Sequence, residues 1–482
     1  MPKAIKSISN PKLHLEILTQ QEIKKIHDAT LWIIEKVGVR FPSKHALDIW
    51  AAHGAVVDPG KMVVRAKAEL VEGALKTCTP VYPLAARDPQ QDLLLDGNHV
   101  FVGTDGCGVE VIDIHTGHRR TSSLQDVREI SRIADATEEV AFHWVPVSAQ
   151  DMPPRTRGLH EIKAIWENST KHVQTESIYN ETEARAAMEM AGLIVGGKDK
   201  LWQRPVLSLM QCSASPLGHD GGSLDAALVA AEYGVPTGFM TMASNLTTGP
   251  ATLAGNLVVG NAEVIAGAAM IQLAFPGAPV FYAAAQTASD LRTGAYTGGG
   301  PEDFLYGAAT NCLSDYYHIP LSMGSFATGA KEPNWQAGVE NSLSTFMACI
   351  AMSDMLLGVG FLHGSRIWSF AEMMMDCEIF SIIHKTMQGI VVDDETLALN
   401  TIAAVGPGGN FLSQKHTLKH MRNLFLPQFM DRRPFGEWET KKDNACDWAL
   451  AKARKTLDTH HPDLLDEKIS AEMSKIISSL EL

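Results

Sequence analysis

The stretch APVFYAAAQTASDLRTGAYTGGGPED, residues 278–303, contains the unit from which the fold can be predicted. An apolar run, APVFYAAA (278–285), leads into a glycine-rich loop that carries Arg292 and Tyr296. The Pro-Glu-Asp that follows this loop is typical of a helix start. A buried strand, a loop and a helix in this order indicate one unit of a parallel α/β fold.

The same unit recurs along the chain. Most of the apolar runs are continuous rather than alternating, which is typical of strands covered on both faces. Eight such units within residues 96–390 predict an α/β fold with a closed (β/α)8 TIM barrel. A doubly wound open sheet is the competing fold, but no GxGxxG motif follows an early strand. The runs are HVFVGTDG (99–106), VAFHWVPVS (140–148), HVQTESI (172–178), PVLSLMQCS (205–213), PTGFMTMAS (236–244), PVFYAAAQT (279–287), PLSMGSFAT (320–328) and MLLGVGFLHG (355–364).

The segments on either side of the barrel differ from it in pattern. Residues 1–95 are predicted to form an N-terminal cap, and residues 96–390 the catalytic barrel domain. Residues 391–482 include KHTLKHMRNLFLPQF (415–429) and ACDWALAKARKTLDTHHPDLLDEKIS (445–470), which predict a helical C-terminal extension.

Composition excludes several classes of partner. The chain has 482 residues and a net charge of −14, without a basic cluster, which argues against nucleic acid and anionic membranes. The most apolar segment, residues 254–282, is interrupted by Asn256, Glu263 and two prolines, so we expect no membrane span. The N-terminus has no run of signal-peptide length, and the seven cysteines are widely spaced, so we expect a cytoplasmic protein with reduced thiols.

One short motif, DIHTGH (113–118), is close to the D-x-H-x-x-G motif of corrinoid-binding domains, in which the histidine binds cobalt. Here Gly117 comes one residue too early. VEVIDI (109–114) followed by TGHRR (116–120) is instead typical of a β-hairpin inserted after the first barrel strand. We therefore predict that this chain holds no corrinoid of its own. HExxH, zinc-spaced Cys/His groups, a P-loop and a GxSxG elbow are also missing from the sequence, which predicts no metal site.

Chemistry in a (β/α)8 barrel takes place where the strands end. His143 and Trp144, within the run 140–148, are the residues of the second unit that we expect near this end of the barrel. The residues predicted to form the polar part of the barrel mouth are Asp105, Glu176, Gln211 and Gln286.

Arginines and aromatic rings near the strand ends suit a ligand with a cationic head and an anionic tail. A quaternary ammonium has no N–H to donate, so aromatic faces are its usual partners, and a carboxylate prefers a guanidinium. Two alternatives stay open: the rings could simply pack loops onto the barrel, and Arg292 could pair with Asp290. The carboxylate candidates are Arg292, His363 and Arg366, and the candidates for an ammonium cage are Tyr282, Tyr296, Trp368 and Phe370.

Nearly the whole chain resembles the trimethylamine methyltransferase (MttB) family, in particular its members that lack pyrrolysine. The resemblance is strongest in TTGPATLAGNLVVGNAEVIAGAAMIQLAFPGAPVFYAAAQTASDLRTGAYTGGGPE (247–302). It also includes IHDATLWIIEKVGVRFPSKHALDIWAAHGAVVD (26–58), GAKEPNWQAGVENSL (329–343) and MMMDCEIFSII (373–383).

The resemblance implies a methyltransferase that moves a methyl group from a methylated amine to Co(I) of a separate corrinoid protein. Cobalamin is then supplied by that partner, and a glycine-rich rim would face it. The rim residues are Gly298, Gly299, Gly300, Thr247 and Gly249.

The substrate expectation rests on the leaving group. This sequence contains only ordinary residues, whereas trimethylamine methyltransferases carry pyrrolysine. A quaternary nitrogen leaves as a neutral amine without acid assistance, so we expect a quaternary amine, glycine betaine first. Proline betaine, carnitine, γ-butyrobetaine and trimethylamine are alternatives. Two other classes compete with the methyltransferase. One is a betaine-binding module without catalytic activity, and the other is a corrinoid-independent lyase or isomerase that uses Glu176 or His143 as base. The sequence leaves the oligomeric state open, with a homo-oligomer as one option.

Overall fold

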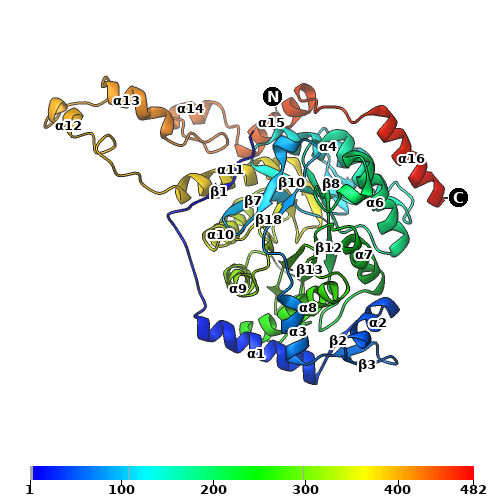
Figure 1. The fold of residues 1–482 in the computed structure, drawn as a ribbon. Helices are drawn as coiled ribbons and strands as arrows, with labels where there is room; N and C mark the ends of the chain where they lie inside the picture. The colour runs from blue at the N-terminus through cyan, green and yellow to red at the C-terminus, as the bar shows by residue number, and fades with distance from the viewer. Residues whose placement is uncertain (1–3, 107, 297, 482) are drawn as a thin grey trace.

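The computed structural model describes residues 4–106, 108–296 and 298–481. Within these residues the centre is a closed barrel of eight parallel strands, which confirms the predicted fold (Figure 1). Strands that are neighbours in sequence pair with each other, and the last strand returns to the first through Met355–Phe101 and Leu356–Val102. The strands are β7 (His99–Thr104), β10 (Val140–Trp144), β11 (His172–Thr175), β12 (Leu207–Cys212), β13 (Thr237–Thr241), β15 (Val280–Ala284), β17 (Leu321–Gly324) and β18 (Met355–Val359).

The pleat of each strand decides which side chains fill the barrel. In β15, Phe281 and Ala283 belong to the interior cluster, whereas Val280, Tyr282 and Ala284 pack in the outer core against the helices. Successive side chains of a strand point to opposite faces, so a shift by one residue exchanges interior and wall.

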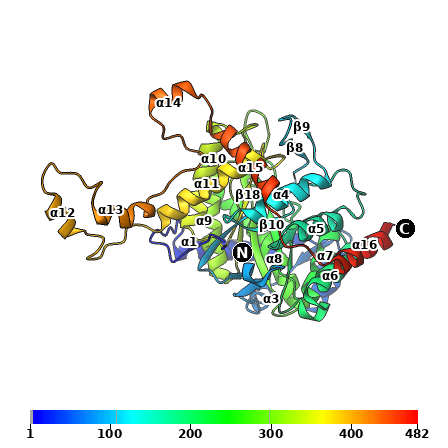
Figure 2. The same cartoon turned by 90° about the horizontal axis from the view of Figure 1, so that it is seen from above.

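Helices cover the outside of the barrel and follow the strands in alternation (Figures 1 and 2). In α6, the Asn180 side chain accepts a hydrogen bond from the Glu183 amide, and Gly196, with φ of 80°, ends the helix. The helices are α4 (Leu124–Ala136), α5 (Arg157–Asn168), α6 (Glu181–Val195), α7 (Gly221–Glu232), α8 (Leu253–Ala274), α9 (Pro301–Tyr317), α10 (Trp335–Ile350) and α11 (Phe370–Met387).

Helix α8 is the one helix, among the described residues, that is long and apolar enough to cross a membrane. Of its most apolar window, 78% is buried inside the protein. We therefore interpret α8 as a core helix of the barrel wall.

The residues before β7 cover α8 and close one end of the barrel. Helices α1 (Gln20–Lys36) and α3 (Ala68–Leu75) pack on α8, beside α2 (Lys44–Ala52). In the hairpin of β5 (Tyr82–Leu84) and β6 (Leu93–Leu95), Leu84 and Leu95 join the barrel interior at its amino-terminal end. A small sheet of β2 (Val39–Arg40), β3 (Val56–Asp58) and β4 (Val63–Arg65) and the edge strand β1 (Ile8–Ser9) complete this part.

Short strands tie together the loops at the opposite, carboxyl end. The predicted hairpin is confirmed as β8 (Glu110–Ile112) and β9 (Arg119–Thr121). Strand β8 also pairs with β20 (Ile367–Ser369), the partner of β19 (Phe361–Leu362). In the same way, β14 (Ser244–Asn245) pairs with β16 (Thr287–Ala288). These pairings hold the loops after the first, fifth, sixth and eighth barrel strands in fixed positions.

The C-terminal part combines packed helices with a protruding segment (Figures 1 and 2). Helix α15 (Ala445–Thr459) contacts α11 and α4, and α16 (Glu467–Glu481) contacts α5 and α6. Between α11 and α15 lie α12 (Leu399–Val405), α13 (Lys415–His420) and α14 (Phe435–Thr440). The helix predicted over 415–429 is wrong beyond one 3₁₀ turn after α13, because this segment has nothing to pack against. The division into three domains stays a prediction.

Candidate active site

The carboxyl ends of the barrel strands surround a cavity of about 200 Å³. Met240, Met323 and Leu357 make part of its lining apolar. Polar and aromatic groups reach it from the loops, from the end of β10 and from the first turn of α9: Asp105, Trp144, Gln286, Tyr296, Asp303, Ser365 and Arg366. Active sites of (β/α)8 barrels lie at this end, so the cavity is the candidate active site.

Two carboxyl groups line this cavity. Asp105, which follows β7, is buried and accepts hydrogen bonds from the Gly106 amide at 2.9 Å and from Ser365 Oγ. Asp303, in the first turn of α9, is partly buried and accepts a hydrogen bond from the Gly300 amide at 3.2 Å. Burial raises the pKa of Asp105 to about 6 and the pKa of Asp303 to about 7. A cation in the cavity would favour the ionised form of both groups.

Two aromatic rings line the same cavity. Trp144 belongs to the barrel interior, and its Nε1 has no hydrogen-bond partner among the described residues. Tyr296 is 41% exposed as a whole residue. Desolvation of its phenol group, followed by the charges of Asp303 and Asp105, raises the pKa of this phenol. Rings and carboxylates together form an environment that attracts a cation without N–H groups.

Arg366 is the arginine that the structure places at this cavity. Its carbonyl accepts hydrogen bonds from the Val109 amide at 3.2 Å and the Glu110 amide at 3.3 Å, which fixes its backbone beside the hairpin. Among the described residues, no carboxylate lies within ion-pairing distance of its guanidinium. His363 does not line the cavity, but burial, followed by the charges of Lys331 and Arg366, lowers its pKa. This edge of the mouth is therefore positively charged.

Arg292 does not stand over the cavity, which corrects the sequence-based placement. Its side chain is 90% exposed and lies 3.6 Å from the Asp290 carboxylate. Asp290 also accepts hydrogen bonds from the Arg292 and Thr293 amides, both at 2.9 Å. The structure thus shows the pairing with Asp290 that the sequence left open, and Asp290 shapes the turn.

Three of the four predicted cage rings are also placed away from the cavity. Tyr282 is an outward-facing residue of β15, and its hydroxyl donates to Asn261 Oδ1 of α8 at 3.2 Å. Trp368 is fully buried between Phe361 and Phe370, with ring centroids 5.2 and 6.3 Å from its own. Tyr282, Trp368 and Phe370 therefore pack the barrel wall and its loops.

The polar residues predicted for the mouth divide between two cavities. Asp105 and Gln286 line the first, where Gln286 Nε2 donates to the Asn256 carbonyl at 2.7 Å. Glu176 and Gln211 line a neighbouring cavity of about 590 Å³. Cys212 borders both, and burial raises the pKa of its thiol to about 12.

Three glycines of the predicted rim pack closely against neighbouring residues and leave no room for a side chain. Gly299 has φ of 80°, and a Cβ there would lie 2.4 Å from Glu340 Cβ. A Cβ on Gly249 would lie 2.0 Å from Asn256 Oδ1. Gly298 is buried against Ala327, whereas Thr247 is exposed at the rim and its hydroxyl lies 3.1 Å from Ser289 Oγ. Contact of these residues and Gly300 with a corrinoid stays a prediction.

Sequence reasoning missed several lining residues. In the sequence, Asp303 indicates only a helix start, because an acidic residue in the first turn of a helix is ordinary capping chemistry. Met240, Met323 and Ser365 carried no signal at all. Trp144, by contrast, could have been chosen from its position at a strand end.

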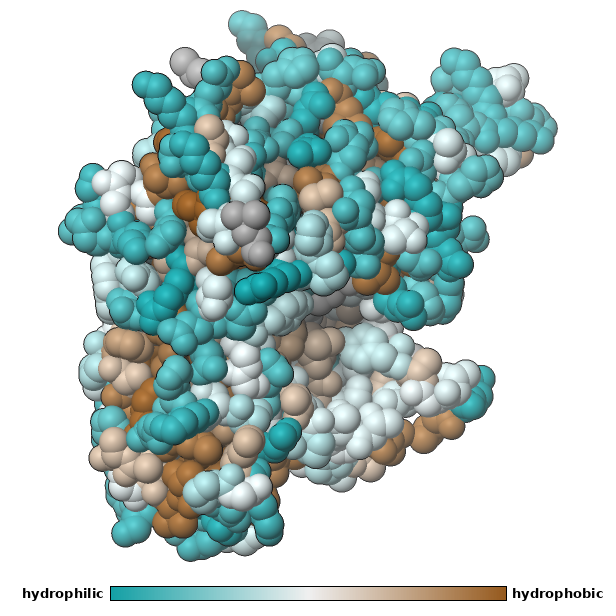
Figure 3. Space-filling view, turned by 90° about the vertical axis from the view of Figure 1, so that its right-hand side faces the viewer, coloured by the Kyte–Doolittle hydropathy of each residue, from teal (hydrophilic) through white to brown (hydrophobic). Residues whose placement is uncertain are grey.

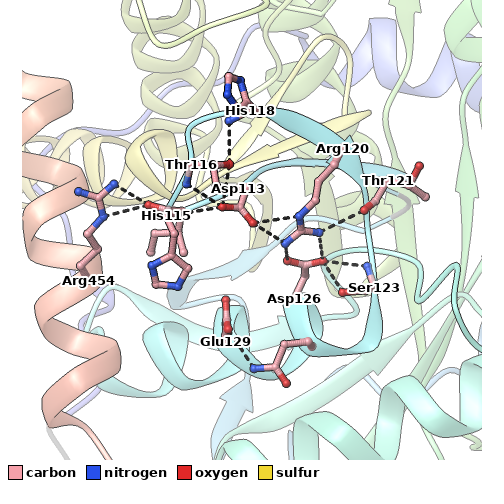
Figure 4. A network of polar contacts seen from close by, with 12 residues as sticks. Asp113, His115, Thr116, His118, Arg120, Thr121, Ser123, Asp126, Glu129 and Arg454 are labelled. Atoms are coloured by element: carbon pink, nitrogen blue, oxygen red, sulfur yellow. Dashed lines mark hydrogen bonds and ion pairs between the residues drawn. The ribbon is translucent and has the colours of Figure 1, made fainter.

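The DIHTGH segment forms the turn of the β8–β9 hairpin (Figure 4). Asp113 accepts hydrogen bonds from the His115 amide at 3.0 Å and the Thr116 amide at 2.8 Å, and these bonds hold its pKa well below the usual range. Arg120 joins Asp113 to Asp126 at 2.9 and 2.8 Å. Asp113 is thus used to hold the turn, as the hairpin interpretation predicts.

The fold and the cavity define a (β/α)8-barrel protein with a small cavity, lined by apolar, aromatic and charged residues, at the carboxyl ends of its strands. Comparison with known proteins gives the particular class. The chain belongs to the trimethylamine methyltransferase (MttB) family, whose model matches residues 1–480, and it is a methyltransferase of that family. Family membership decides against the betaine-binding module and against the lyase or isomerase.

Relatives with different substrates are equally similar to this chain. Trimethylamine methyltransferase MttB of Desulfitobacterium hafniense (strain DSM 10664 / DCB-2) is 32% identical over 96% of this chain and 93% of its own length. Glycine betaine methyltransferase of Desulfitobacterium hafniense (strain Y51) is 32% identical over 96% of both. Monomethylamine methyltransferase (MtmB) of Methanosarcina barkeri has a similar fold, with a TM-score of 0.50 over 94% of this chain and 96% of that one at 12% identity. The substrate therefore has to be argued from the site.

The family acts through a partner corrinoid protein. A corrin ring is much larger than a cavity of about 200 Å³ and does not fit inside it. A position of the ring across the opening of the cavity stays a prediction. Among the described residues, no group of three or more His, Cys, Asp or Glu side chains is arranged to hold a metal ion.

Proposed function

We propose that this enzyme takes a methyl group from a quaternary amine, with glycine betaine as the first candidate, and passes it to a separate corrinoid protein in the cytoplasm. The observation that carries the proposal is the content of the mouth cavity. Trp144, Tyr296, Asp105 and Asp303 favour a cationic head, and Arg366 favours an anionic tail. Glycine betaine is the first candidate because its ammonium and its carboxylate are one carbon apart and both have to lie within one cavity; proline betaine, carnitine and γ-butyrobetaine are the alternatives.

The chemistry of the leaving group supports a quaternary substrate. One N–CH3 bond breaks, its electron pair stays on nitrogen, and a neutral tertiary amine leaves. The reduced corrinoid supplies the electron pair for the new bond to the methyl carbon. No proton has to move, whereas neutral trimethylamine would have to leave as an amide anion. The chain consists of ordinary residues and has no special group for that harder step.

The role of the protein is then mainly to orient one N–CH3 bond toward the corrinoid. The ammonium charge disappears as the bond breaks. Carboxylates and rings that bound this charge too tightly would stabilise the ground state more than the transition state. We therefore expect a loose cage and weak substrate binding.

A substrate panel tests the proposal directly. The protein is mixed with a Co(I) corrinoid and one amine at a time, and the loss of Co(I) absorbance is followed. Glycine betaine should react faster than the longer betaines, and trimethylamine should not react. Reaction of trimethylamine without reaction of any quaternary amine would show that the leaving-group argument is wrong.

A further inference from the structure

Three consecutive residues in the loop between β19 and β20 have a left-handed backbone. The φ angles of His363, Gly364 and Ser365 are 56°, 62° and 59°. Residues other than glycine rarely adopt this conformation, because their Cβ then lies too close to the backbone. Such a conformation persists where the surrounding structure enforces it, and it is found most often at functional sites. The loop is therefore a candidate for a role in the adjoining mouth cavity.

Hydrogen bonds from the loop after β17 hold these residues in place. The His363 amide donates to the Ala330 carbonyl at 2.7 Å, and the Gly364 amide donates to the Thr328 carbonyl at 2.9 Å. The antiparallel pairing of β19 with β20 closes the hairpin around them. These contacts fix the backbone on both sides of Ser365, so its side chain has a defined direction.

The left-handed loop brings Ser365 to the end of β7. Its Oγ donates to Asp105 Oδ2, and the Gly106 amide donates to Asp105 Oδ1 at 2.9 Å. Each oxygen of this carboxyl therefore has a donor. Ser365 and Asp105 both line the mouth cavity, although they are 260 residues apart in the sequence.

Asp105 has lost the water that stabilises a carboxylate at the protein surface. Acidic side chains ordinarily lie on a hydrophilic surface such as the face in Figure 3. Asp105 is instead only 7% exposed. Burial raises its pKa to about 6, and the hydrogen bonds from Ser365 and Gly106 counteract this rise. The charged form of Asp105 therefore depends on donors that the protein supplies in place of water.

The other ionisable groups around Asp105 do not take over this task. A neighbouring carboxylate opposes its ionisation. Burial raises the pKa values of the nearby thiol and phenol, so both are neutral near pH 7. The one nearby guanidinium belongs to the residue that we assign to the carboxylate of the substrate. These groups are Glu176 after β11, Cys212 at the end of β12, Tyr296 after β15, Asp303 in α9 and Arg366 beside Ser365.

We propose that Ser365 is a positioning residue, whose hydroxyl holds the Asp105 carboxyl in place and in its charged form at the wall of the mouth cavity. The inference rests on the proposed function for its ligand, the ammonium group that the charged Asp105 attracts. Because the loop fixes the hydroxyl in advance, no rearrangement is needed when the cation binds. Glycine would adopt the backbone of residue 365 more easily, but it has no hydroxyl to donate.

An infrared pH titration of the full chain without substrate tests the link between Ser365 and Asp105. Asp105→Asn identifies the carboxyl band of Asp105. Ser365→Gly should raise the pH midpoint of this band by about one pH unit or more, because a hydrogen bond to a charged group contributes at least that much. The matched control is Ser213→Ala, which removes a 2.5 Å bond to the buried Glu263 outside the mouth cavity and should leave the midpoint unchanged. An unmoved midpoint in folded Ser365→Gly would overturn the proposal.

KM for glycine betaine at two pH values tests the effect on the substrate. Ser365→Gly should raise KM by about fivefold or more at about pH 6, where less of its Asp105 is ionised than in the wild type. At about pH 9 Asp105 is charged in both proteins, and KM should differ by less than about twofold. Ser365→Ala also lacks the hydroxyl and should show the same pH dependence, with circular dichroism as the check that both variants are folded.

The two measurements separate this proposal from the proposed function. An equal rise of KM at both pH values would indicate a merely structural role of Ser365 and would overturn the proposal. If the wild type reacted with no quaternary amine, the proposed function would be wrong. The infrared midpoint would then still decide whether Ser365 controls the charge of Asp105.

Discussion

Arg366 lies at the edge of a cavity whose other charged groups are carboxyls. Under the proposed function, the carboxylate of a betaine therefore binds at Arg366 and its ammonium group binds near the carboxyls. Arg366→Ala should lower kcat/KM for glycine betaine by about 10- to 100-fold, because a charged hydrogen bond contributes about 1.5–3 kcal/mol. Tetramethylammonium has no carboxylate, and its kcat/KM should change little. The matched control is Arg292→Ala, which removes an exposed arginine outside the cavity. If only the Arg292→Ala control lost glycine betaine activity, the substrate carboxylate would bind at Arg292, in the loop after β15, and not at Arg366.

Tyr296 contributes a ring rather than a hydroxyl under the proposed function. Tyr296→Ala should raise KM for a quaternary amine by roughly 2- to 30-fold, the equivalent of a cation–π contact of about 0.5–2 kcal/mol. Tyr296→Phe keeps the ring and should behave like the wild type in the same steady-state assay. An equal loss in both variants would indicate that the hydroxyl, and not the aromatic face, binds the substrate.

The carboxyl of Asp303 makes substrate binding depend on pH. Its pKa rises from 3.8 to about 7 on folding because of burial, so the folded state holds this proton more tightly between these values. Ionisation of Asp303 therefore lowers the stability of the folded state increasingly as pH rises from about 4 to about 7. A cation bound beside Asp303 offsets this loss, because it stabilises the ionised carboxylate. KM for a quaternary amine should fall as pH rises from about 6 to about 8. Asp303→Asn should remove most of this change, and Glu302→Gln on the same turn should retain it.

At the scale of the element, strand phase decides which aromatic residues can reach a ligand. Phe281 and Tyr282 are neighbours in one apolar run, yet Phe281 fills the barrel and Tyr282 packs on α8. A run that is apolar on both faces carries no alternation from which the inward residues could be read. For this reason the placement of Tyr282 in the cage failed although the strand itself was predicted.

The β5–β6 hairpin offers an element-scale test within one strand. Leu95 is fully buried in the barrel interior, whereas its neighbour Leu94 is 45% exposed. Leu95→Ala should lower the free energy of unfolding by about 2–5 kcal/mol, because it leaves a cavity in the core. Leu94→Ala should lower it by less than about 1 kcal/mol. Urea unfolding measures both, and equal effects would mean that the hairpin does not close the barrel.

At the scale of the whole molecule, the segment 388–428 extends away from the barrel (Figures 1 and 2). Because residues 388–428 have no buried residue, they should be the first to be cut by a protease. Cleavage in this segment should be at least about tenfold faster than cleavage within the barrel strands. Mass spectrometry of the fragments locates the cut. Equal cleavage rates in the segment and in the barrel would contradict this expectation.

The chain's own sequence determined the eight strands, the order of the barrel, the hairpin at 109–120 and the family, because these depend on local apolar runs, turn residues and long matching segments. It also determined that Asp105, Gln286, Tyr296 and Arg366 follow strands and so lie toward the carboxyl end. Only the tertiary structure decided which side chains meet at the mouth: it brings Trp144 and Asp303 into the cavity and leaves Arg292, Tyr282, Trp368 and Phe370 outside. The physical reason is that a side chain's direction depends on strand phase and loop pairing between segments far apart in sequence, and neither leaves a local pattern.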